Sequence, residues 1–101
     1  MRMTKRRPES VGQMLIKEFI EPMGISINDL ADAMGVHRNT LSRIVHERGK
    51  LTVSVAVKLA AALGTSPDFW LNIQHATEIW DVQHHVFGRE SANVMPLATG
   101  V

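Results

Sequence analysis

Apolar residues recur along the chain at spacings of three and four residues, which is the pattern of helices that bury one face. Val11, Leu15 and Phe19 form the first such stripe, and later segments repeat the spacing. No segment alternates apolar and polar residues in the way that is typical of a β-strand. The sequence therefore predicts an all-α protein.

Capping residues divide this pattern into five helices, expected over residues 11–21, 27–34, 37–46, 53–63 and 67–85. A hydroxyl side chain that can accept from the first turn precedes four of them, namely Ser10, Ser26, Thr52 and Ser66. Helix ends are expected at Pro22 and Gly24, at Gly35 and at Gly64. Because the connections are short, the five helices are expected to form one compact domain.

The length and composition agree with a single small domain. A chain of 101 residues buries one modest core. We expect a basic flexible arm over residues 1–9, the helical domain over 10–86 and a flexible tail over 87–101. With no cysteine, no apolar run of membrane-spanning length and no apolar segment after the basic start, the sequence favours a cytoplasmic protein without a membrane partner.

The segment from Ile27 to Ile44 has the spacing of a helix-turn-helix. With Ile27 as the first position, Ala31 is the fifth, Gly35 the ninth, Leu41 the fifteenth and Ile44 the eighteenth. A small residue at the fifth position lets two helices cross closely, and a glycine at the ninth allows a left-handed turn. The alternative is an ordinary corner between two helices of a bundle.

The outer face of the helix expected at 37–46 favours DNA recognition. Its polar residues are Arg38, Asn39, Ser42 and Arg43, with no carboxylate before Glu47. Arginine can pair with guanine and asparagine with adenine in the major groove. We therefore predict base readout by these four residues, with Arg38 and Asn39 in the first turn, whereas His37 is expected to cap the helix.

Phosphate contacts are expected from the surrounding helix ends and loops, at Ser26, Asn28, Thr40, Arg48 and Lys50. Residues 1–50 hold nine Lys and Arg against six Asp and Glu, whereas residues 51–101 hold two against four. The first half is thus the candidate for contact with a polyanion. Arg48 and Lys50 are alternatively solvated loop charges, and the arm with Lys5, Arg6 and Arg7 is either a DNA-binding arm or a solubilising tail.

Several motifs together resemble a known family. The run Phe19–Ser26, the pairs Leu30-Ala31, Ser42-Arg43, Leu51-Thr52 and Leu59-Ala60, and Met34-Gly35-Val36 are similar to the Cro/CI-type helix-turn-helix family. The run Gly64-Thr-Ser-Pro-Asp-Phe-Trp-Leu-Asn-Ile-Gln74 resembles the HigA antitoxins, also called VapI-like or addiction-module antidote proteins. The similarity covers roughly residues 10–83.

The resemblance implies a five-helix, lambda-repressor-like domain that binds an operator as a homodimer and represses its own operon. It also implies a HigB-like, RelE-type ribonuclease toxin as partner. Three positions depart from the family pattern: Val11 and Gln13 flank Gly12 in place of proline and glutamate, Val53 replaces a proline, and the glycine after the recognition helix is displaced to Gly49. The last departure concerns the loop that holds Arg48 and Lys50.

The last predicted helix has two apolar stripes. One, expected to pack on the other helices, comprises Phe69, Trp70, Ile73, Ala76 and Trp80. The other comprises Leu71, Ile79 and Val82 on the opposite side. A symmetric partner would cover the second stripe, and a dimer would present two recognition helices about 34 Å apart to a palindromic operator. The alternative is that these are isolated surface residues, which are common.

Other chemistries have little support in the sequence. His75, His84 and His85 are not spaced as metal ligands, so we expect no metal site and no cofactor. No cysteine nucleophile or glycine-rich phosphate loop is present, so we expect no enzyme. Two classes remain: a DNA-binding repressor that is an antitoxin or a free-standing regulator, and a helical protein-interaction module.

Overall fold

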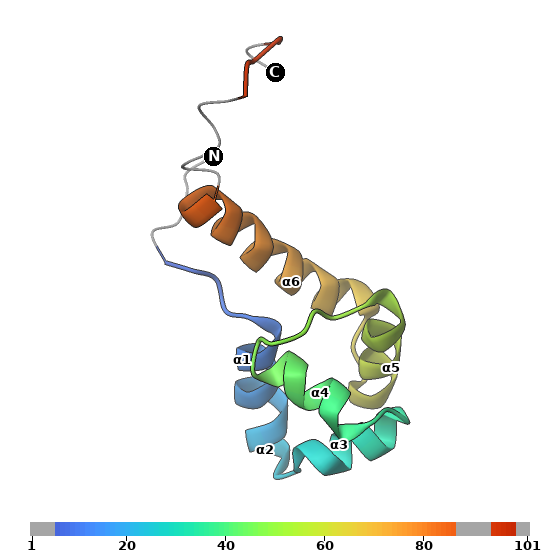
Figure 1. The fold of residues 1–101 in the computed structure, drawn as a ribbon. Helices are drawn as coiled ribbons and strands as arrows, with labels where there is room; N and C mark the ends of the chain where they lie inside the picture. Colours follow the sequence, from blue (N-terminus) through green and yellow to red (C-terminus); the bar gives the residue numbers. More distant parts are fainter. Residues whose placement is uncertain (1–5, 87–93, 99–101) are drawn as a thin grey trace.

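The computed structural model describes residues 6–86 and 94–98, and within these ranges it contains helices and no strand. The elements are α1 (Val11–Leu15), η1 (Ile16–Ile20), α2 (Glu21–Met23), α3 (Ile27–Met34), α4 (Arg38–Val45), α5 (Val53–Leu63), α6 (Pro67–Asp81) and η2 (Val82–Val86). Since α1, η1 and α2 follow one another without a break, as do α6 and η2, the elements form the five predicted helices. Figure 1 shows α6 projecting beyond the other helices.

The first helix begins as predicted but does not end at Pro22. Ser10 Oγ accepts from the Gln13 N–H at 3.1 Å, and Gln13 Oε1 accepts from the Ser10 N–H at 2.9 Å, which makes a reciprocal cap. The helix continues through Pro22 to Met23 because the turn before the proline widens into η1, where the Glu21 N–H donates to the Ile16 carbonyl. Gly24, which was also predicted to close this helix, ends it in the left-handed region at φ 64°.

The predicted helix-turn-helix is present as α3 and α4. Ser26 caps α3, and Gly35 ends it in the left-handed region with φ 69°. His37 caps α4 through its side chain, which accepts from the Asn39 N–H at 3.1 Å. Ala31, only 1% exposed, allows α3 and α4 to pack closely.

The last two helices follow their predicted caps. Thr52 caps α5 and Ser66 caps α6, each by accepting from an amide of the first turn. The final helix continues through η2 to Val86, close to the predicted end. Of the predicted tail over 87–101, residues 87–93 and 99–101 lie outside the described residues, as do residues 1–5 of the predicted arm. Residues 94–98 form no helix.

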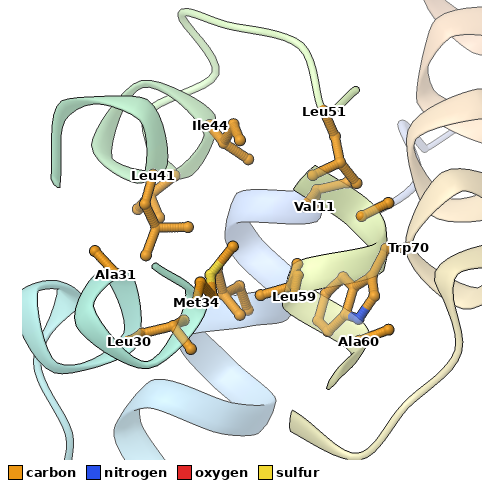
Figure 2. Close-up of a cluster of buried hydrophobic side chains, with 13 residues drawn as sticks. Val11, Leu30, Ala31, Met34, Leu41, Ile44, Leu51, Leu59, Ala60 and Trp70 are labelled. Atoms are coloured by element: carbon orange, nitrogen blue, oxygen red, sulfur yellow. The ribbon is translucent and has the colours of Figure 1, made fainter. Parts of the chain in front are cut away.

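Every helix contributes to one apolar core (Figure 2). Trp70 of α6, Leu15 of α1, Leu41 of α4 and Leu59 of α5 are completely buried. The Trp70 indole N–H donates to Thr65 Oγ1 at 2.7 Å, so the one polar atom of this large side chain has a partner. Burial of these side chains provides the main driving force for folding and fixes α4 against the other helices.

The buried face of α6 differs from the predicted one. Trp70 is buried as predicted, but Phe69 is 38% exposed and Ala76 is exposed, whereas Thr77 is buried. The side that faces the core is therefore rotated towards Thr77, whose hydroxyl donates to the Gln74 carbonyl at 2.8 Å. This intrahelical bond satisfies the buried hydroxyl, so a polar residue can occupy a core position that the apolar pattern did not reveal.

The described helices have no membrane-spanning character. None of them has both the length and the apolar composition that a bilayer crossing requires.

Candidate nucleic-acid interface

One side of α4 is polar and solvent-facing, while the opposite side is part of the core. Arg38, Asn39 and Arg43 are exposed, and Ser42 is half-buried. The opposite residues are Leu41, Ile44 and Val45, all buried. The arrangement follows from the amphipathic pattern of the helix. The four residues predicted for base readout thus lie on one helix, with the arginines and Asn39 accessible to a partner.

The side chain of His37 caps the N-terminal end of α4. His37 Nδ1 accepts from the Asn39 backbone N–H, so the imidazole is committed to the helix end. The contact uses the backbone of Asn39 and not its side-chain amide. Arg38 and Asn39 therefore project from the first helical turn, the part of a recognition helix that meets base edges in helix-turn-helix proteins.

A hollow of about 310 Å³ separates α4 from the beginning of α5. Its polar lining combines Asn39, Thr40 and Arg43 of α4 with Lys50 and Thr52 of the connecting segment. Two cationic side chains and two hydroxyl groups are suited to phosphate oxygens. The structure thus brings together two residues predicted for phosphate contact, Thr40 and Lys50, beside the predicted base reader Arg43.

The N-terminus of α3 is less open to an anion than the sequence suggested. Ser26 Oγ accepts from the Asp29 N–H at 3.0 Å, and Asp29 Oδ2 accepts from the Ser26 N–H at 3.0 Å. These two bonds lower the pKa of Asp29 below its usual value, and the bond from the Ser26 backbone amide contributes most. The Asp29 side chain is therefore an ionised carboxylate. It places negative charge beside Ser26, while Asn28 is exposed in the same turn. Phosphate contact here is easier for Asn28 than for Ser26.

The segment after α4 has an unusual turn. Glu47 has φ 59°, the left-handed region in which a non-glycine side chain is strained. The N–H groups of Arg48 and Gly49 both donate to the Arg43 carbonyl, at 2.7 and 3.2 Å. The Arg43 guanidinium in turn donates to the Arg48 carbonyl at 3.4 Å. At this turn Glu47, and not the displaced Gly49, takes the left-handed conformation.

Side chains of α6 hold the same segment at several points. Gln74 Oε1 accepts from the Leu51 N–H at 2.7 Å, and Gln74 Nε2 donates to the Leu51 carbonyl at 2.9 Å. Lys50 Nζ lies 3.1 Å from Glu78 Oε2. Lys50, predicted for phosphate contact, therefore has an ion-pair partner in this structure, while Arg48 is exposed.

Arg7, predicted to belong to a flexible arm, is also anchored to this region. Its Nε and Nη2 atoms donate to the two carboxylate oxygens of Asp81 at 2.8 and 3.0 Å, and its Nη1 atom donates to Glu47 Oε1 at 3.0 Å. The two carboxylates raise the pKa of the guanidinium, which remains charged. The apolar pattern gave no indication of the roles of Gln74, Asp81 and Glu47. In the sequence, Gln74 and Asp81 share one helix face with Glu78, but this does not identify distant partners, and Glu47 carries no such signal.

The residues predicted for dimerisation fall into two environments. Leu71 is half-buried and packs against the core. Ile79 and Val82 are 44% and 47% exposed and line a shallow groove of about 370 Å³ with His75, Glu78 and Gln83. The C-terminal part of the predicted stripe is thus the more exposed part.

No group of three potential metal ligands is found among the described residues. The His84 ring stacks on Trp80, with ring centroids 3.9 Å apart, and its Nδ1 atom bonds to the Trp80 carbonyl at 2.9 Å. His84 of η2 thus has a structural role, because it contacts Trp80 of α6.

Comparisons with known proteins agree with this geometry. A family model described as helix-turn-helix matches residues 16–70. The chain is 59% identical over 97 residues to Antitoxin HigA-1 of Vibrio cholerae, covering 96% of this chain and 90% of that protein. Such relatives are named as antitoxins and transcription regulators, not enzymes.

Similar solved structures include complexes with DNA. The Pseudomonas aeruginosa antitoxin HigA with the higBA promoter is 29% identical, with a TM-score of 0.82, covering 91% of this chain and 100% of that one. Antitoxin GraA in complex with its operator is 32% identical, with a TM-score of 0.86, covering 98% of this chain and 100% of that one.

Proposed function

This chain belongs to the HigA antitoxins of the helix-turn-helix family, and from this premise we propose that it is a sequence-specific DNA-binding repressor of its own operon. The observation on which the proposal rests is the exposed, carboxylate-free face of α4 within a helix-turn-helix. A helix of this kind can enter the major groove and read base edges. Similar antitoxins in complex with a promoter and with an operator support the proposal.

Within this proposal the contacts have two kinds of role. Arg38, Asn39, Ser42 and Arg43 read bases. Phosphates are contacted by Thr40, Lys50, Arg48 and Asn28, while Ser26 caps the N-terminal end of α3. Ion pairing with Glu78 does not prevent such a role for Lys50, since the lysine side chain is 79% exposed and exposed pairs exchange partners at low cost.

A direct test is fluorescence anisotropy of the full chain with labelled duplex DNA from upstream of its own gene. A scrambled duplex of the same length and composition is the control, at near-physiological salt. We expect a preference of about a thousandfold or more for the upstream DNA. Equal, steeply salt-dependent binding to both duplexes would indicate phosphate attraction alone. Absence of binding would instead favour a protein-interaction module.

The repressor is proposed to act as a homodimer on a palindromic operator. The exposed pair Ile79 of α6 and Val82 of η2 supports a second copy as the occupant of this groove. A two-fold symmetric dimer would place two copies of α4 in successive major grooves. The two half-sites of the operator are therefore expected about 34 Å apart. A footprint of one half-site only would contradict this arrangement.

The chain is further proposed to neutralise a HigB-like, RelE-type ribonuclease toxin, which places both proteins in the cytoplasm with their operon. Support comes from the 59% identity to an antitoxin. The test is co-expression with the gene adjacent to its own. Growth arrest by the neighbouring gene alone, relieved by this chain, is the expected result. A neighbouring gene without toxicity would leave a free-standing regulator as the function.

A further inference from the structure

Three side chains on one face of α6 hold the segment that follows the recognition helix. Gln74 binds both backbone groups of Leu51, Glu78 pairs with Lys50, and Asp81 reaches Glu47 through the Arg7 guanidinium. Their spacing of four and three residues places them on the same side of the helix. In Figure 1 the segment between α4 and α5 accordingly runs alongside α6.

We propose that Arg7 is a positioning residue for DNA recognition: by bridging Asp81 and Glu47 it fixes the turn that ends α4, and with it the direction of the Arg43 side chain. The inference rests on the proposed function, because it assigns a role to residues that support the DNA-contacting helix. Arg7 acts through this turn and does not itself need to touch DNA.

The geometry of Arg7 is suited to such a bridge. Two guanidinium N–H groups engage both oxygens of Asp81, which defines the plane of the group, and a third points to Glu47. A bidentate contact of this kind fixes orientation as well as distance. Arg7 stands three residues before the Ser10 cap of α1, so its backbone is held close to an ordered helix end.

Glu47 transmits the constraint to the recognition helix. Its backbone is in the strained left-handed region, so the turn gains from a side-chain contact that maintains this conformation. In that conformation the amides of Arg48 and Gly49 reach the Arg43 carbonyl, and the Arg43 guanidinium reaches the Arg48 carbonyl. Release of Glu47 would loosen these three bonds and widen the range of directions open to Arg43.

Asp81→Asn is the decisive variant because positioning and simple electrostatics predict opposite effects. Removal of a negative charge should tighten binding to any DNA slightly. If Asp81 acts through Arg7, the variant should instead lose about three- to tenfold in affinity for the upstream duplex, a range found for residues that act indirectly, with no loss on the scrambled duplex. Asp68→Asn, with the same change of charge in the first turn of α6, is the control and should show no selective loss.

Arg7→Lys provides the complementary test, since lysine keeps the charge but lacks the planar fork. It should reproduce the selective loss of Asp81→Asn, and the double variant should lose no more than either single one. Circular dichroism should show unchanged helix content in all variants, because the three side chains of the bridge are 34–43% exposed.

Hydrogen exchange of the free protein separates this inference from the proposed function. In Asp81→Asn and Arg7→Lys the amides of Arg48 and Gly49 should exchange several times faster than in the wild type, while the amide of Leu59 in the core should not change. Unaltered protection of Arg48 and Gly49 would overturn the bridge whatever the DNA results. Selective binding by the wild type, retained in full by Asp81→Asn, would overturn only the positioning role. A wild type without preference would overturn the proposed function, and the positioning role with it.

Discussion

At the scale of single residues, Gly12 shows how closely the recognition helix is packed. A Cβ atom at this position would lie 2.8 Å from the Val45 carbonyl carbon, which is backbone and cannot rotate away. Gly12→Ala should therefore push the C-terminal end of α4 outwards and lower the free energy of unfolding by roughly 1–3 kcal/mol. Thermal and urea denaturation followed by circular dichroism would measure the loss.

Gly24→Ala is the matched control for this prediction. Gly24 has φ 64° but open space around its α-carbon, so alanine there meets conformational strain and no clash. We expect this strain to lower the free energy of unfolding by about 1 kcal/mol, which is less than the loss expected for Gly12→Ala. Equal stability of Gly12→Ala and wild type would show that α1 and α4 are not in this close contact.

Through Asp29, the stability of the beginning of the helix-turn-helix depends on pH. Its pKa is lowered in the folded state, so its contribution to stability is present above the usual carboxyl pKa near 4 and is lost as the pH falls through the lowered value. Asp29→Asn should consequently show a smaller decrease in melting temperature between pH 7 and pH 3 than the wild type.

Asp32→Asn, on the same helix but outside the cap, is the comparison for Asp29. It should keep the acid dependence of the wild type. The same pH dependence in all three proteins would mean that the bonds between Ser26 and Asp29 do not form in solution.

At the scale of elements, the helix ends could be predicted because their signals are local. A hydroxyl cap or a left-handed glycine acts on the turn next to it, and Thr52, Gly35 and Gly64 do so here. The turn after α4 and the anchors on α6 could not be predicted in the same way. They depend on contacts between distant residues, such as Arg7 with Asp81, and on a strained Glu47 that no local rule favours.

The outer face of α4 was predictable for the same local reason, since helical periodicity fixes which residues share a side. The phosphate contacts were harder to predict. Sequence alone gives no means of knowing that Asp29 occupies the end of α3 or that Glu78 pairs with Lys50. The residues on a single helix could therefore be predicted well from the sequence. Those whose surroundings depend on contacts between loops and other elements could not.

The recognition helix should separate specificity from folding. Arg38 is exposed in the first turn of α4, so Arg38→Ala should leave the helix content and melting temperature nearly unchanged. If Arg38 reads a base, the variant should lose about 1–3 kcal/mol of binding free energy on the upstream duplex and much less on the scrambled one. Fluorescence anisotropy on both duplexes would measure the difference.

Lys58→Ala removes the same charge from an exposed position on α5 and is the control. This variant should bind both duplexes slightly more weakly than the wild type, and to the same extent. If Arg38→Ala also lost affinity equally for both duplexes, Arg38 would be assigned to phosphate contact and not to base readout.

At the scale of the whole molecule, two exposed apolar surfaces compete for the role of dimer interface. One is the groove where α6 meets η2, with Ile79 and Val82, and the other is the outer side of α5, where Val53 and Val57 are 65% and 50% exposed. The groove is the stronger candidate because its apolar residues line a concave surface that a second copy can fill.

Ile79→Asp should therefore convert a dimer into a monomer, because a charge buried without a partner opposes association strongly. Size-exclusion chromatography with light scattering would show a fall in mass from twice the 11.2 kDa of the chain to that of one chain. Val57→Asp, an equivalent change on α5, should remain dimeric. Dissociation by Val57→Asp and not by Ile79→Asp would move the interface to α5, and would change the orientation in which the two copies of α4 approach the operator.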